Sequence, residues 1–273
     1  MSDAMLTPHE LELAALVDLL ARVGEECASL DKAVAGVKRN ALGFAFKLTG
    51  HAASALTLLR DKSALVSGGI RFLDRTSVFL LARAGWEAFL LFHWIFVSPG
   101  EDDPERHLRY RRWSIESPRR RQHFEIVLDG QAEQMAEEQR EIEAALAQIR
   151  ANPAFLKRSP KEQHEFLRNR GRWRPSFPEM GTAAGVAKIF AEDHYAYLCD
   201  HAHSGWFSLE SLKGSLTDEE QRLLRETVAA SLCIAAAFTI SGLQDLFEGL
   251  HAPPVVDAQR VARWVAQGQA REE

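Results

Sequence analysis

The stretch VFLLARAGWEAFLLFHWIFV, residues 78–97, is almost entirely apolar and contains no proline. It continues a helical pattern that begins at Ile70, after a pair of glycines, and Ser98-Pro99-Gly100 ends it. Arg83 and Glu87 stand four residues apart on the face that also carries large apolar side chains. We therefore expect a long helix over residues 70–97 that directs this charged pair toward the protein interior.

The same stretch is long enough to span a membrane. It contains Arg83, Glu87 and His93, however, and an arginine at the bilayer centre costs roughly 2.5 to 3.5 kcal/mol on insertion scales. A second apolar run, residues 228–243, carries no charge but is short for a span. We expect both runs to form buried bundle helices, and we expect no membrane span.

Helical signals continue over most of the chain. Apolar residues recur at spacings of three and four, while Thr7-Pro8 and the pair Thr217 and Glu220 mark helix starts. We find neither alternating strand patterns with hairpin turns nor internal repeats. The expected fold is an all-α, irregular bundle of about six to eight helices, over residues 7–30, 31–60, 70–97, 103–116, 117–151, 183–204 and 217–250.

We expect a single helical domain over residues 1–250. Its core would occupy roughly residues 70–250, with the N-terminal helices of residues 7–66 packed on it. Four prolines between residues 153 and 182 predict a long irregular connection, with one short helix near its middle. The segment 251–273 is expected to be a peripheral C-terminal tail.

Composition limits the class of protein. The 273 residues are 46% hydrophobic, which is typical of a globular chain, and the net charge of -5 argues against a uniformly basic nucleic-acid binder. Cys27, Cys199 and Cys233 are widely spaced and form no C-x-x-C motif, so neither a disulfide framework nor a zinc knuckle is expected. The acidic N-terminus does not resemble a signal peptide. We expect a reduced, cytoplasmic location.

Cofactor and metal motifs are missing from the sequence. It contains no P-loop, no dinucleotide fingerprint and no H-E-x-x-H. A di-iron bundle needs two Glu-x-x-His motifs, and we find one, Glu248 to His251, at a helix end. We therefore expect no cofactor and no bound metal.

A second polar feature is the stretch YAYLCDHAH, residues 195–203. Tyr195, Cys199 and His203 are spaced four and four, which places them on one stripe of a helix. If this stripe meets Arg83 and Glu87, two interpretations are open. The residues could form a buried polar network that fixes the bundle, or His203 could act as an acid or base beside them.

Two segments are rich in basic residues. Residues 106–121 hold seven arginines interleaved with aromatic side chains, and residues 157–174 hold seven more basic residues. Arginines with aromatics suit phosphate contact and base stacking, so the candidates for nucleic-acid binding are Arg109, Arg112, Arg119 and Arg172. The alternative is a solvated helix face, or arginines that pair with the acidic helix of residues 133–143.

These motifs resemble a known family. Arg83-Ala-Gly-Trp-Glu87, Trp173, and Tyr195 with Cys199 and His203 are similar to the motifs of a bacterial domain-of-unknown-function family, number 5677. The family usually has serine at the position of Cys199, so this chain lacks the hydroxyl there. The resemblance implies that Arg83, Glu87, Tyr195 and His203 converge, and these four are the candidate catalytic residues.

The chain is also distantly similar to the HEPN helical bundles, many of which are RNases. The HEPN motif places an arginine four to six residues before a histidine on a helix. The one pair with this spacing, Arg158 and His164, begins in the irregular connection and fits poorly. An RNase would instead have to use His203 as the base and Arg83 on the phosphate.

Two functions of different classes remain. One is a HEPN-like, metal-independent RNase or nucleic-acid-acting effector that uses Arg83, Glu87 and His203, with RNA as its partner. The other is a non-catalytic binding or interaction module, homodimeric through the helix around residues 137–150, in which the Arg-Glu-Tyr-His set is a buried network. We favour the module, because charged pairs in cores are more common than active sites.

Overall fold

A computed structural model of the chain describes residues 6–30, 37–60, 74–100, 102–125, 129–168, 173–202, 210, 217–247, 251 and 254–270. Every regular element in these ranges is a helix, and no strand occurs in them, so the all-helical class is as expected. The prediction of about six to eight helices is wrong. The described ranges contain more α-helices than that, together with two π-helical segments, η1 (His93–Val97) and η2 (Ile189–His194).

The chain forms two compact units. Unit 1 consists of Met1–Val97 and Phe177–Glu273, and unit 2 consists of Ser98–Ser176, which interrupts unit 1 in the sequence. The single domain over residues 1–250 stays a prediction.

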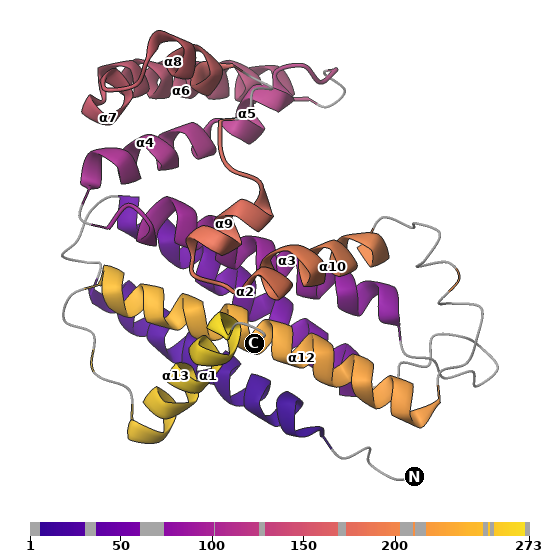
Figure 1. Cartoon of the computed structure of the whole chain (residues 1–273). Helices are drawn as coiled ribbons and strands as arrows, with labels where there is room; N and C mark the ends of the chain where they lie inside the picture. The colour runs from indigo at the N-terminus through magenta and orange to yellow at the C-terminus, as the bar shows by residue number, and fades with distance from the viewer. Residues whose placement is uncertain are drawn as a thin grey trace. The chain divides into compact units, whose positions relative to one another are not determined.

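Unit 1 is built from long helices with shorter ones packed on them (Figure 1). The pairs α1 with α12 and α2 with α3 lie side by side, and α10 packs along α3. The helices of this unit are α1 (Pro8–Leu30), α2 (Val37–Arg60), α3 (Arg75–Phe92), η1, α9 (Phe177–Ala183), η2, α10 (Tyr195–Ala202), α12 (Asp218–Leu246) and α13 (Val255–Gln269).

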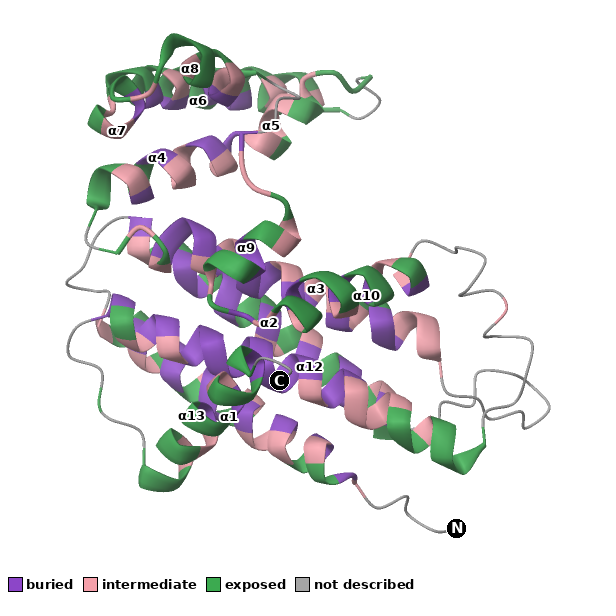
Figure 2. Cartoon of the chain, viewed as in Figure 1, coloured by how far each residue is buried: buried purple, intermediate pink, exposed green. Residues whose placement is uncertain are grey.

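The core of unit 1 centres on α12. Almost every residue from Val228 to Ile240 is buried, so this helix is covered on all sides, while its N-terminal turns are exposed (Figure 2). The predicted capping box is confirmed: the Thr217 hydroxyl accepts from the backbone N–H of Glu220, and the Glu220 carboxylate accepts from the backbone N–H of Thr217. The cap fixes where the helix begins.

The C-terminal segment differs from the predicted peripheral tail. It forms α13, whose Trp264 is only 2% exposed. The Glu12 carboxylate of α1 accepts hydrogen bonds from the Trp264 indole at 3.3 Å and from Arg260 at 3.2 Å. Gly268 packs so closely that an added Cβ would lie 2.7 Å from Ile234. Because α13 supplies a buried indole and a close backbone contact, it is part of the core.

Unit 2 contains five helices in its described part, where the sequence predicts fewer. The expected helix over residues 117–151 is two helices, because the chain turns after Arg121. The expected connection after Asn152 contains two short helices, each started by a capping side chain followed by proline. The helices are α4 (Asp103–Ser114), α5 (Glu116–Arg121), α6 (Gln131–Ala151), α7 (Pro153–Leu156) and α8 (Pro160–Leu167).

The longest helix of unit 2, α6, has a narrow buried stripe. Ile142, Ala145 and Ile149 are buried at spacings of three and four, whereas most of the rest of the helix is exposed (Figure 2). This stripe packs on α4, whose Leu108 is fully buried. The two helices therefore form the apolar centre of unit 2.

The prediction of no membrane span is contradicted by the helices themselves. Three helical segments are long and apolar enough by length and composition: Val37–Arg60, Arg75–Val97 and Asp218–Leu246. The sequence pattern did not indicate Val37–Arg60 as a span. The helix Asp218–Leu246 has 29 residues and is much longer than the apolar run 228–243 that it contains. Between 44% and 67% of each apolar window is buried inside the structure, so part of each surface packs on protein. The cytoplasmic location stays a prediction.

Candidate functional site

Three predicted site residues meet in unit 1. The Arg83 Nε donates a hydrogen bond to Glu87 Oε1 at 2.8 Å, one turn along α3. The Tyr195 hydroxyl, from the first turn of α10, donates to the same oxygen at 3.0 Å. The structure thus brings Arg83, Glu87 and Tyr195 together around one carboxylate oxygen, and we call this group the Glu87 cluster. His203, the fourth candidate, lies outside the described residues.

The Glu87 cluster is only partly shielded from solvent. The side chains of Arg83 and Glu87 are 21% and 27% exposed, while Tyr195 is 9% exposed. Burial opposes the charge of Arg83, but the Glu87 carboxylate holds the pKa of Arg83 above its usual value. Burial and the nearby Glu87 charge both raise the pKa of Tyr195. The phenol therefore keeps its proton at neutral pH and acts as a hydrogen-bond donor to Glu87.

Cys199 lies next to the Glu87 cluster on α10. It is half-buried, and it is close enough to influence the pKa of both Arg83 and Tyr195. The stripe that the sequence predicts for Tyr195 and Cys199 therefore does face α3.

A second polar pair was missed from the sequence. His194 is the last residue of η2, and its Nε2 lies 2.8 Å from the Ser231 hydroxyl of α12. Aromatic rings of Trp86 and Phe190 stand edge-on to the imidazole. Burial lowers the pKa of His194 to about 4, so the ring is neutral at pH 7.

The geometry of this pair argues against nucleophilic chemistry at Ser231. A serine nucleophile needs a basic partner and an open path to substrate. Ser231 is only 1% exposed, in the middle of the most buried helix. The hydrogen bond joins η2 to α12 and satisfies two polar groups in the core. The signal for it is weak in the sequence, because a π-helical segment changes which neighbouring residues face inward.

Arg112 of unit 2 stabilises the fold. Its side chain is fully buried, its Nε donates to the carbonyl of Phe166 at 2.7 Å, and its Nη2 donates to that of Arg168 at 2.9 Å. The guanidinium carbon also lies 4.7 Å from the centroid of the Trp173 ring. Arg119 donates to the carbonyl of Leu167 at 2.9 Å. Together these arginines cap the C-terminal end of α8.

Several other arginines of the basic segments also pair with carboxylates. Arg109 pairs with Glu105 at 2.7 Å, and Arg158 pairs with the same carboxylate at 3.0 Å. Arg121 donates hydrogen bonds from Nε and Nη2 to the Glu138 carboxylate of the acidic helix. This pair matches the alternative in which the arginines bind the acidic helix. Arg109, Arg112 and Arg119 therefore bind protein groups, and the prediction that they contact nucleic acid gains no support. Arg172 lies outside the described residues.

Across the described ranges, no group of three or more histidine, cysteine, aspartate or glutamate side chains could hold a metal ion.

Comparison with known proteins places the chain in one family. The model of a family of unknown function (DUF5677) matches residues 46–221, which include the Glu87 cluster and all of unit 2. No curated protein and no solved structure matches the chain, and the likeness to HEPN bundles gains no support. The match covers well over half of the 273 residues and agrees with the motifs around Arg83 and Tyr195. The chain belongs to the family of unknown function DUF5677.

Proposed function

We propose that this protein is a non-catalytic helical binding module, and that the Glu87 cluster is a structural polar network of unit 1. The observation that carries the proposal is the double hydrogen bond to Glu87 Oε1. It ties Arg83 on α3 to Tyr195 on α10 through one carboxylate. A carboxylate that already accepts from a guanidinium and a phenol is positioned to hold two helices in register.

The protonation states of the neighbouring groups support this role. Tyr195 stays protonated at neutral pH, since burial and the Glu87 charge raise its pKa, and His194 stays neutral, since burial lowers its pKa to about 4. A general base works best when its pKa lies near the operating pH. The pKa values of both side chains are shifted away from neutral pH, which favours fixed hydrogen bonds over proton transfer.

Three candidate arginines of unit 2 support the same conclusion. Arg112 and Arg119 donate to backbone carbonyls, and Arg109 pairs with Glu105. A guanidinium used in this way stabilises the fold and is not free to bind an RNA phosphate. No specific observation favours the HEPN-like alternative.

An RNA cleavage assay tests the proposal. Purified wild-type protein, Glu87→Gln and His203→Ala would each be incubated with a mixed-sequence RNA, with and without EDTA. We expect no difference in cleavage between the three proteins, because the cluster has no catalytic role. Cleavage by the wild type that resists EDTA and disappears in either folded variant would overturn the proposal.

A further inference from the structure

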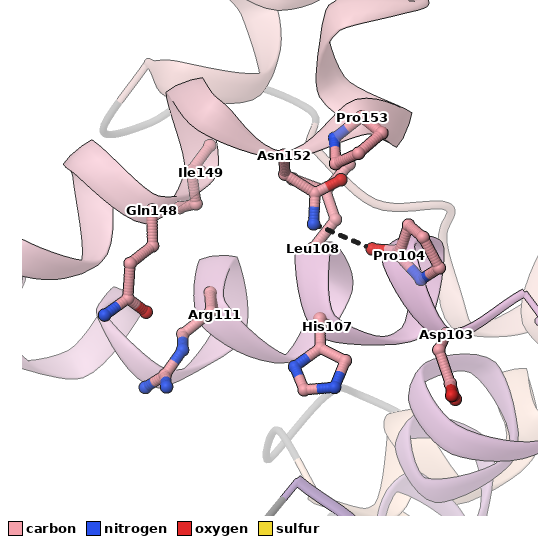
Figure 3. Close-up of a pocket in the computed structure, with 9 residues that line it drawn as sticks. All are labelled: Asp103, Pro104, His107, Leu108, Arg111, Gln148, Ile149, Asn152 and Pro153. Atoms are coloured by element: carbon pink, nitrogen blue, oxygen red, sulfur yellow. Dashed lines mark hydrogen bonds between the residues drawn. The ribbon is translucent and has the colours of Figure 1, made fainter.

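Unit 2 contains an open pocket of about 350 Å³ between α4 and the C-terminal end of α6 (Figure 3). Its apolar lining is formed by Leu108 and Ile149, with Pro104 and Pro153. The hydrogen bond from the Asn152 amide to the carbonyl of Pro104, at 2.9 Å, ties the two walls together. The volume is at the lower end of the range of small-molecule sites, about 300 to 1,000 Å³.

Besides Asn152, three nitrogen-bearing side chains line the same pocket. His107 and Arg111 stand one turn apart on α4, and Gln148 comes from α6. Figure 3 shows the Gln148 amide and the Arg111 guanidinium on the same side of the pocket. The pocket therefore combines hydrogen-bond donors from two helices with an apolar surface.

Arg111 differs from the other arginines of α4. Arg106 pairs with Asp103, Arg109 pairs with Glu105, and Arg112 binds backbone carbonyls. Within the part of the chain that the structure describes, the Arg111 guanidinium has neither a hydrogen bond nor an ion pair, and its carbon lies 5.7 Å from the centroid of the Tyr110 ring.

The side chains of His107 and Gln148 likewise form no hydrogen bond with any described residue. Asp103, the acidic side chain at the pocket, is neutralised by Arg106. The net charge offered to a ligand is thus positive and comes from Arg111.

We propose that this pocket binds a small organic carboxylate, with Arg111 as its charged contact. A single guanidinium with a neutral amide beside it matches a monoanion, and the planar fork of arginine suits a carboxylate. The exposed rings of Pro104 and Pro153, which lie beside the buried Leu108 and Ile149, would cover the hydrocarbon part of the ligand. The inference goes beyond the proposed function and does not depend on the Glu87 cluster, since every lining residue belongs to unit 2.

Binding of defined probes tests the proposal. Hexanoate and benzoate would be titrated into the full chain by saturation-transfer NMR, with hexanamide and benzamide as neutral probes of the same shape and inorganic phosphate as a third class. The same titrations would use Arg111→Gln and the control Arg120→Gln, an exposed arginine of α5. Helical circular dichroism would establish that each variant is folded.

We expect the carboxylates to bind and the amides to bind at least about tenfold more weakly. Arg111→Gln should raise the Kd of the carboxylate by about tenfold or more, which is the loss of one charge-assisted contact, and Arg120→Gln should leave it unchanged. Equal binding of acids and amides, an unaffected Arg111→Gln, or no binding of either acid would overturn the proposal. Binding of phosphate alone would also overturn it.

Discussion

The substitution Arg112→Met tests whether the buried guanidinium of unit 2 is a structural clamp. Methionine has a similar length and fills the same buried space, but it cannot donate to the carbonyls of Phe166 and Arg168. Hydrogen bonds from a charged donor contribute about 1.5 to 3 kcal/mol each, so losing two of them costs about 3 to 6 kcal/mol. The stacking contact with Trp173 is lost as well.

The cost of burying the charge works in the opposite direction. Burial, reinforced by the nearby Arg119 charge, lowers the pKa of Arg112 from 12.5 to about 10. That lowering corresponds to about 3 kcal/mol against the charged form, which methionine would relieve. The loss of the hydrogen bonds to the two carbonyls outweighs the relief of the burial cost, so the net loss of stability is about 2 kcal/mol. A loss of this size should accelerate hydrogen exchange at α8 amides by about 30-fold.

Hydrogen exchange followed by mass spectrometry on peptides covering residues 160–168 measures this effect directly. Arg120→Met is the matched control, because Arg120 is exposed, and a surface substitution there should change stability by less than about 0.5 kcal/mol. Exchange in Arg112→Met that is equal to or slower than in the wild type would refute the reasoning, since the burial cost would then exceed the value of the hydrogen bonds.

Two further predictions concern unit 1. The pKa of His194 is about 4 in the folded chain and 6.5 in the unfolded one, so the unfolded chain binds the proton first as the pH falls. The unfolding free energy of the wild type should therefore fall by about 2 kcal/mol between pH 7 and pH 5 because of His194. Urea titrations at the two pH values should show a decrease smaller by about this amount in His194→Gln, and equal decreases in the two proteins would contradict the role of His194. Gly268→Ala should lower stability by about 1 to 3 kcal/mol, because its Cβ would lie 2.7 Å from Ile234, whereas Gly43→Ala, with nothing within 4 Å, should raise it by up to about 1 kcal/mol. Thermal unfolding of both alanine variants checks this pair, and a destabilised Gly43→Ala would count against it.

The all-helical class could be predicted from the sequence because the apolar spacing and the caps act locally. The capping box of Thr217 and Glu220 starts α12 as predicted. The number of helices could not be predicted, because short helices such as α7 and α8 are stabilised by contacts distant in sequence, including those of Arg112 with Phe166. The role of α13 depends on Glu12, more than 240 residues away.

The meeting of Arg83, Glu87 and Tyr195 could be anticipated from helical spacing and from the family motifs. The pair of His194 and Ser231 could not, because it depends on the π-helical geometry of η2. The arginines of unit 2 were misread for a related reason. The partners of Arg112 and Arg119 are backbone carbonyls, which any residue type provides, so no sequence pattern marks them.

The proposal of a structural Glu87 cluster is tested most directly by a double-mutant cycle. The unfolding free energies of the wild type, Glu87→Ala, Tyr195→Phe and the double variant would be measured by urea titration at pH 7. A structural network predicts that both single variants lose stability and that the coupling is about 1 kcal/mol, the value of a charge-assisted hydrogen bond reduced for partial exposure. Residues kept for catalysis are often replaced without loss or with a gain of stability. Single variants as stable as the wild type or more stable, with no coupling between them, would contradict the structural role of the cluster.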